Sequence, residues 1–180
     1  MRWLVDGYNV IRRAPELISR ERESLEAGRQ ALCALLVEAA RASEDTFTVV
    51  FDGAQAGGRA GGGSGVTVIF SSARESADRV LSRMARDGGA VVSNDREVRR
   101  AAERAGAIVV TTDQFLARLD QDRPVPPEAR PEARVDEKEG DESLPPRGPR
   151  KGNPRRLSKK DRATQRALGR LGPGRHPRTS

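Results

Sequence analysis

The chain has 180 residues, enough for one domain of ordinary size with room for a tail. Its net charge of +7 is uneven, because residues 1–119 carry +1, residues 120–142 carry −5 and residues 143–180 carry +11. Residues 1–119 contain no lysine and no histidine, which excludes from that segment a Ser-His-Asp triad, a P-loop lysine, a Schiff base and a His/Cys zinc site. Carboxylates, hydroxyls, amides and arginines remain to carry any chemistry there.

Five short apolar runs rich in β-branched residues predict buried strands, since each is bounded by Gly, Asp, Ser or Thr. These runs cover residues 2–5, 47–51, 66–70, 90–92 and 107–110. Stretches with helical spacing lie between most of them or follow the last, at residues 24–42, 76–87, 95–105 and 113–119. This alternation predicts an α/β fold, a three-layer α/β/α sandwich around a central parallel sheet, because parallel strands need crossover connections.

The composition changes at about Leu119, where we expect the domain of residues 1–119 to end. Residues 120–154 are rich in proline and pass from acidic to basic, which is typical of a linker. Residues 155–180 form a basic tail, in which residues 155–171 have the weak apolar stripe of a short helix that would be marginal alone. We therefore expect a disordered, charged C-terminal tail.

The cysteine content and the N-terminus predict a cytoplasmic protein with no membrane partner. No stretch approaches the ~18 consecutive apolar residues of a membrane helix, and the first residues lack the pattern of a signal peptide. Cys33 has no partner for an intramolecular disulfide, as expected in a reducing compartment. The sequence carries no signal for a particular oligomeric state.

Four aspartates occupy related positions along the chain. Asp6, Asp52 and Asp95 follow predicted strands, and Asp78 lies in the first turn of a predicted helix. Because the carboxyl ends of parallel strands meet at one edge, where crossover helices also begin, we expect these carboxylates to converge. Clustered carboxylates repel one another unless a cation compensates, so the pattern predicts a Mg²⁺ or Mn²⁺ site. Such a site supports phosphodiester hydrolysis without histidine or lysine.

Five motifs in this order resemble those of YacP-like NYN-domain proteins, which are relatives of PIN-domain nucleases. The motifs are Leu4–Ile11, Val49–Gly53, Val68–Ser71, Glu75–Leu81 and Val91–Val98. The resemblance covers about residues 1–119 and implies a PIN-like sandwich. It carries metal-site roles onto Asp6, Asp52, Asp78 and Asp95, with Asn9 and Ser93 as polar helpers that position water, metal or phosphate. It also implies endoribonuclease activity on messenger RNA, and ribosome association is known for a family member.

The chain departs from a compact family member in a Gly-rich loop at residues 57–65 and in its long basic tail. The loop lacks the Gly-Lys-Ser/Thr ending of a P-loop and precedes a strand, so we interpret it as a flexible loop over the site. A charge of +11 over residues 143–180 is typical of binding to a phosphate backbone. The candidate RNA-binding residues are Arg59, Arg74, Arg155, Arg156, Lys159 and Lys160.

Simpler interpretations exist for each acid. Asp6 and Asp52 each precede glycine, a pair that often makes a turn, whereas Asp78 and Asp95 suit the positive end of a helix dipole. A non-catalytic RNA- or ribosome-binding module is the main alternative function. Aspartyl-phosphate chemistry is a third, but residues 1–119 lack the lysine that it uses. The common position of the acids at strand and helix ends favours the nuclease.

Overall fold

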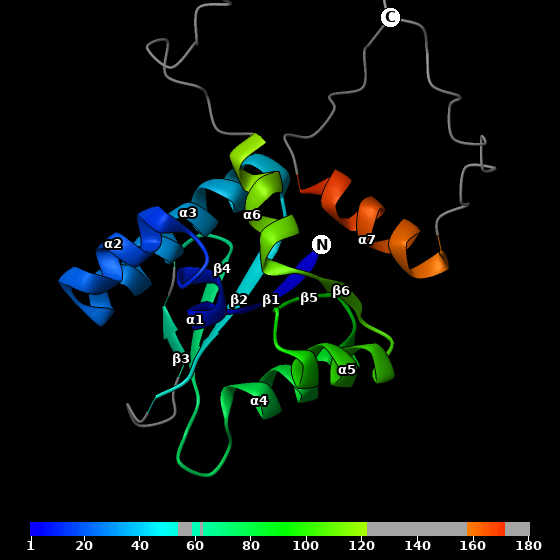
Figure 1. Cartoon of the computed structure of the whole chain (residues 1–180), viewed down its shortest axis with the longest axis horizontal. Helices are drawn as coiled ribbons and strands as arrows, with labels where there is room; N and C mark the ends of the chain where they lie inside the picture. The colour runs from blue at the N-terminus through cyan, green and yellow to red at the C-terminus, as the bar shows by residue number, and fades with distance from the viewer. Residues whose placement is uncertain (54–58, 62, 122–157, 172–180) are drawn as a thin grey trace, which may run out of the picture.

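The computed structural model describes residues 1–53, 59–61, 63–121 and 158–171, which form a six-stranded sheet between two layers of helices (Figure 1). The strands are β1 (Arg2–Asp6), β2 (Thr46–Phe51), β3 (Arg59–Gly61), β4 (Val66–Phe70), β5 (Ala90–Val92) and β6 (Ile108–Val110). Their order across the sheet is β3-β4-β2-β1-β5-β6. Five strands are parallel, and β3 pairs antiparallel with β4. The predicted α/β/α sandwich is confirmed, with each predicted strand placed to within one residue at either end.

The helices of the described chain are α1 (Gly7–Ile11), α2 (Pro15–Glu23), α3 (Leu25–Ser43), α4 (Ala77–Met84), α5 (Arg96–Arg104), α6 (Thr112–Gln121) and α7 (Lys159–Arg170), with a 3₁₀ turn, η1 (Ala85–Asp87), after α4. The four helices predicted between residues 24 and 119 correspond to α3, to α4 with η1, to α5 and to α6. The sequence did not predict α1, α2 or β3. Of these, β3 lies inside the segment that we expected to be a loop.

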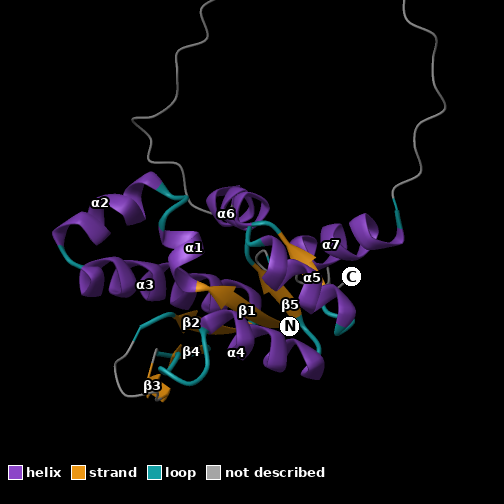
Figure 2. Cartoon of the chain, turned by 60° about the horizontal axis from the view of Figure 1, so that its bottom comes forward, coloured by secondary structure: helices purple, strands orange, loops and turns teal. Residues whose placement is uncertain are grey.

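The sheet is covered on both faces, which explains why its strands read as continuous apolar runs. On one face, α1, α2, α3, α6 and α7 cover a core that contains Trp3, Phe47 and Phe115, whose ring centroids lie 5.6 to 6.4 Å apart. On the other, α4 and α5 pack against Leu4 and Val91. Figure 2 shows the two helical layers on opposite sides of the strands. No helix in the described ranges is long and apolar enough to cross a membrane.

Helix α7 packs against β6, although it comes from the segment predicted as a basic tail. The Thr164 hydroxyl donates to the Val109 carbonyl at 3.0 Å, and Arg118 Nε donates to the Leu168 carbonyl at 3.0 Å. Ala167 and Leu171 are buried in the main core. Packing therefore stabilises a helix that would be marginal alone. The rest of the expected linker and tail, residues 122–157 and 172–180, lies outside the described residues.

Candidate active site

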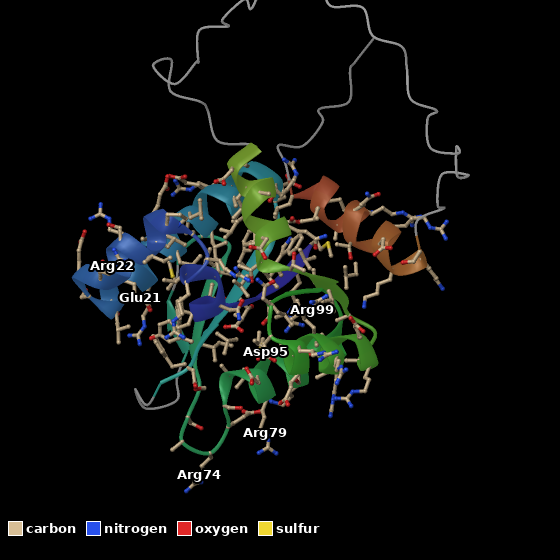
Figure 3. All side chains as sticks on the ribbon, viewed as in Figure 1. Glu21, Arg22, Arg74, Arg79, Asp95 and Arg99 are labelled. Carbon is tan, nitrogen blue, oxygen red and sulfur yellow. The ribbon has the colours of Figure 1, made fainter. Side chains whose placement is uncertain are left out.

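The carboxyl edge of the parallel sheet carries an open cavity of about 640 Å³, and all four predicted aspartates line it. Each comes from a different element: Asp6 ends β1, Asp52 follows β2, Asp78 lies in the first turn of α4, and Asp95 caps α5. Figure 3 labels Asp95 at the start of α5. The topology thus brings together residues that are up to 89 positions apart in the sequence. Predicted helper Asn9 also lines the cavity.

Ser93 fixes two of these acids from inside the fold. Its side chain is fully buried, and its hydroxyl donates to Asp6 Oδ2 at 3.0 Å while accepting from the Asp95 backbone N–H at 3.0 Å. The other Asp6 oxygen accepts from the Asn9 N–H at 3.2 Å and caps α1. Ser93 therefore joins the end of β1 to the start of α5.

A second network joins the ends of β1, β5 and β6. Asn9 Oδ1 accepts from the Asn94 N–H at 3.0 Å and from the Thr112 hydroxyl at 2.9 Å. Asn94 Oδ1 in turn accepts from the Thr112 N–H at 3.0 Å. These bonds fix the Asn9 amide with its oxygen directed inward, so its Nδ2 is the end available to a ligand in the cavity.

Asp52 is held by a residue that the sequence analysis missed. Ser71, which directly follows β4 and is 2% exposed, donates to Asp52 Oδ1 at 2.5 Å and accepts from the Gly53 N–H at 3.3 Å. Thr112 and Asn94 were missed as well. All three follow a strand, so the rule that found the aspartates would have found them if applied to hydroxyl and amide side chains.

The turn after β1 depends on a close approach of backbone to an aromatic ring. A Cβ atom at Gly7 would lie 2.3 Å from Phe51 Cε1, so no larger residue fits. The Tyr8 hydroxyl accepts from Arg29 Nε at 2.9 Å, and the Arg29 guanidinium lies 5.1 Å from the centre of the Phe70 ring. The Tyr8 hydroxyl is thus engaged by its neighbours.

The charged forms of Asp6 and Asp78 are destabilised in the cavity. Burial is the main cause that raises the pKa of Asp6, opposed by its hydrogen bonds from Ser93 and Asn9 and reinforced by the charges of Asp78 and Asp95. The pKa of Asp78 is also raised, first by burial and then by the charges of Asp95, Asp52 and Glu97. Within the described residues none of the four forms an ion pair. A cation in the cavity would remove this unfavourable interaction.

The donor set fits a hard divalent cation, because the four carboxylates in the cavity offer oxygen ligands. In the part of the chain that the structure describes, no three acidic, histidine or cysteine side chains are arranged to enclose an ion together. A Mg²⁺ ion in a protein generally keeps several waters and binds through one or two carboxylates together with substrate phosphates.

Of the predicted RNA-binding residues, Arg74, Lys159 and Lys160 lie outside the cavity lining. Arg74 is exposed in the turn before α4 and projects away from the domain (Figure 3). Lys159 and Lys160 begin α7, and Lys160 pairs with Glu103 of α5. Arg59 is in β3, but its side chain lies outside the described residues, as do Arg155, Arg156 and much of the Gly-rich segment. Instead, Arg12 and Arg13, which directly follow the unpredicted α1, line the cavity.

Comparison with known proteins agrees with this fold. The sequence model of the YacP-like NYN domain matches residues 3–146. The crystal structure of a point mutant of Rae1 (YacP) from Bacillus subtilis is similar at 25% identity with a TM-score of 0.58, covering 67% of this chain and 75% of that one. The structure of Rae1 (YacP) without that mutation gives 25% identity, a TM-score of 0.55, and coverage of 67% and 74%. No curated protein matches the chain.

Proposed function

Because the chain belongs to the YacP-like NYN domain family, whose members have the fold of PIN-like nucleases, we propose that it is a divalent-metal-dependent endoribonuclease. The observation that carries this proposal is the cavity lined by Asp6, Asp52, Asp78 and Asp95, none of which has a cationic partner in the described chain. An acid cluster of this kind is costly for folding and is expected where a cation and a phosphate substrate use it.

In this proposal the four aspartates hold one or two Mg²⁺ or Mn²⁺ ions. When bound, such ions supply an activated water and stabilise the charge of the leaving oxygen in a phosphodiester displacement. The residues of the chain orient the reactants. Ser93 and the Asn9 N–H hold the Asp6 carboxylate in place, while Asn9 Nδ2, fixed by its neighbours, is free to donate to a phosphate oxygen.

Two arginines favour a nucleic-acid substrate at this cavity. Arg12 and Arg13 line it, with side chains 68% and 54% exposed, so their guanidinium groups can reach phosphates that flank the scissile bond. Their ion pairs with Glu21 at 3.9 Å and Asp113 at 4.0 Å are at the limit of such contacts. A phosphate would therefore compete well for both.

We extend the proposal to messenger RNA as substrate, the ribosome as partner and the cytoplasm as location. The family resemblance supports the first two, and the charge of +11 over residues 143–180 supplies a segment suited to attach to RNA. The tail contains no Phe, Tyr or Trp, so its contribution is attraction to phosphates without base stacking.

The direct test uses a circular RNA, which only an endonuclease can open. Wild-type protein should open it in Mn²⁺ or Mg²⁺ and not in EDTA. Asp6→Asn and Asp78→Asn should each lower the rate by at least about 100-fold, because a metal ligand supplies several kcal/mol to the transition state. Glu23→Gln, an exposed acid on α2, is the matched control and should cleave normally.

Two outcomes would overturn the proposal. Equal rates for wild type and Asp6→Asn would show that the cavity does not perform the reaction. RNA binding without divalent-dependent cleavage of either free RNA or translating ribosomes would identify the chain as a binding module instead.

A further inference from the structure

A groove between α4 and α5 begins at the aspartate cavity. Asp78 lines both the cavity and the groove. Along α4 and η1 the groove is lined at positions 79, 82, 83 and 86, and along α5 at 97, 98, 101 and 104. Residues three or four apart share one helical face, so each helix presents a single side to the groove. Both helices begin at the carboxyl edge and lie side by side under the sheet (Figures 1 and 2).

Charge changes along this groove. It is lined by three acids, of which Asp78 and Glu97 lie in the first turns of the two helices, next to the cavity, and Glu75 precedes α4. Arg86 and Arg104 lie at the opposite ends of the same helical segments. A strand whose scissile phosphate occupies the cavity would thus meet the carboxylates first and the arginines beyond them.

Three arginines in the groove are available to a ligand. Arg79, Arg86 and Arg104 are exposed and form no ion pair with any residue that the structure describes. Arg83 differs, because its Nε and Nη2 donate to the two Glu75 oxygens at 3.0 and 3.2 Å. That pair engages both oxygens of the nearby acid, and leaves the other three arginines to bind an external anion.

The position of Arg79 is unfavourable for the helix alone. It lies in the first turn of α4, where the helix dipole disfavours a cation. Arg86 and Arg104, near helix ends where a cation is favoured, are explained in part by that effect. The helix dipole does not explain Arg79, which projects outward from α4 in Figure 3. Glu75 interacts with Arg79 electrostatically but forms no ion pair with it, so an anionic ligand would complete the compensation of its charge.

We propose that the α4–α5 groove holds the phosphate backbone of the RNA strand on one side of the scissile bond, through Arg79, Arg86 and Arg104. This inference rests on the proposed function and deepens it. From position 78 to position 86 the helical rise is about 12 Å. Successive phosphates of a stacked strand advance by about 3.4 Å, so the groove accommodates several nucleotides.

The chemistry of the groove assigns it to positioning and not to sequence recognition. Its lining contains no Phe, Tyr or Trp on which a base could stack. Arginine contacts to phosphates fix the register of a strand and carry no sequence information. The groove should therefore bind strands of different sequence with similar affinity.

The test compares two triple variants of the full chain that remove the same charge. Arg79→Ala/Arg86→Ala/Arg104→Ala empties the groove, whereas Arg20→Ala/Arg22→Ala/Arg41→Ala removes three exposed arginines from α2 and α3, on the other side of the sheet. Binding of a fluorescent single-stranded 12-mer RNA is measured in EDTA at several KCl concentrations. Circular dichroism melting verifies that both variants fold.

The groove variant should bind at least about tenfold more weakly than wild type at low salt, and its log affinity should depend less on log salt, with a slope smaller by about 2 for three lost phosphate contacts. The control should change affinity by less than about threefold. The charge-conserving variant Arg79→Lys/Arg86→Lys/Arg104→Lys should keep most of the wild-type affinity.

Equal weakening in both alanine variants would show that net charge alone matters, and no weakening in the groove variant would show that RNA does not use it. Either result overturns the inference. Because binding is measured without metal, it is independent of cleavage. If the protein binds RNA through the groove but cuts none, the groove proposal holds and the proposed function is wrong. If the protein cuts RNA and the groove variant binds RNA as tightly as wild type, the proposed function holds and the groove proposal is wrong.

Discussion

Aspartates at the two edges of the parallel sheet have opposite environments. At the amino edge, Asp45 is 4% exposed, accepts from Trp3 Nε1 at 2.9 Å and pairs with the Met1 ammonium group. At the carboxyl edge, Asp52, Asp78 and Asp95 are exposed, and none forms an ion pair in the described chain. The buried acid is compensated within the protein, and the exposed ones are not.

This difference separates two uses of the same side chain. A buried carboxylate persists only if donors and a cation satisfy it, so Asp45 contributes to stability as long as its partners are present. The acids at the carboxyl edge weaken the fold by mutual repulsion, which contributes to the raised pKa of Asp6 and of Asp78. The proposed function accounts for their presence together, because it requires a ligand that the protein itself does not supply.

The largest expected effect is at the amino edge. Asp45→Ala should lower the free energy of unfolding by about 3 kcal/mol or more, because it leaves a buried indole N–H and an ammonium group without their acceptor. Asp78→Ala, at an exposed position on the other edge, should change it by less than about 1 kcal/mol. Urea denaturation measures both. Similar losses in the two variants would contradict the distinction between the edges.

A smaller effect is expected where the carboxyl edge depends on a buried hydroxyl. Ser93→Ala removes the donor to Asp6 and the acceptor for the Asp95 N–H, and should cost about 1 to 2 kcal/mol. It should also lower kcat for RNA cleavage by about 10-fold or more with KM little changed, since a freed Asp6 no longer holds its position.

Thr164→Ala is the matched control for Ser93. It removes a buried hydroxyl that donates to the Val109 carbonyl, and neither residue is part of the cavity lining. Its stability should fall comparably while kcat stays at the wild-type value. If Ser93→Ala also kept the wild-type kcat, its hydroxyl would serve the fold alone.

The sheet could be predicted from sequence because its strands are buried on both faces. In runs such as Phe47–Phe51, β-branched and aromatic residues follow one another closely. Polar residues do not interrupt these runs in the pattern that would indicate a helix. The acids could be predicted because, once a parallel sheet is assumed, every residue that directly follows a strand lies at the carboxyl edge of that sheet. Asn9 was carried by the family resemblance, and the structure shows why it matters for the arrangement: it bridges three strand ends.

The elements that escaped prediction have weak local signals. Only Leu17 is buried in α2, so the helix has no apolar stripe, and its packing against α3 is a tertiary effect. The short β3 lies in a Gly-rich segment without β-branched residues, and pairing with β4 decides its structure. Arg12 and Arg13 reach the cavity because α1 directs the chain across the carboxyl edge of the sheet. The sequence pattern of a five-residue helix is too short to predict this path.

The docking of α7 also depends on a distant partner. The acceptor for Thr164 is Val109, 55 positions earlier in the chain, and nothing in the sequence around residues 155–171 indicates that surface. A basic segment with few apolar residues is typical of a tail. In this protein, Ala167 and Leu171 are enough to dock α7 against the core, because β6 presents an apolar face that these two side chains cover.

The smallest expected effect concerns the repulsion among the acids themselves. Asp78→Asn should raise the Tm by about 1 to 3 °C at pH 7 to 8 in EDTA, since it removes one charge from the cluster at a partly exposed position. The pKa of Asp78 is raised above its ordinary value of 3.8, so the folded state favours the protonated form. The penalty is therefore absent at pH values below 3.8 and appears as the pH rises through the folded-state pKa. The gain in Tm should accordingly vanish below about pH 3.8.

The effect of Mg²⁺ on the Tm tests the same difference between the two edges of the sheet. Adding Mg²⁺ at neutral pH should raise the Tm of wild type more than that of Asp78→Asn, because an ion that binds the folded state stabilises it and the variant lacks one carboxylate of the cavity. A variant that melts below wild type at pH 7.5 in EDTA, or that gains as much as wild type from Mg²⁺, would show that Asp78 is compensated within the fold in the way that Asp45 is.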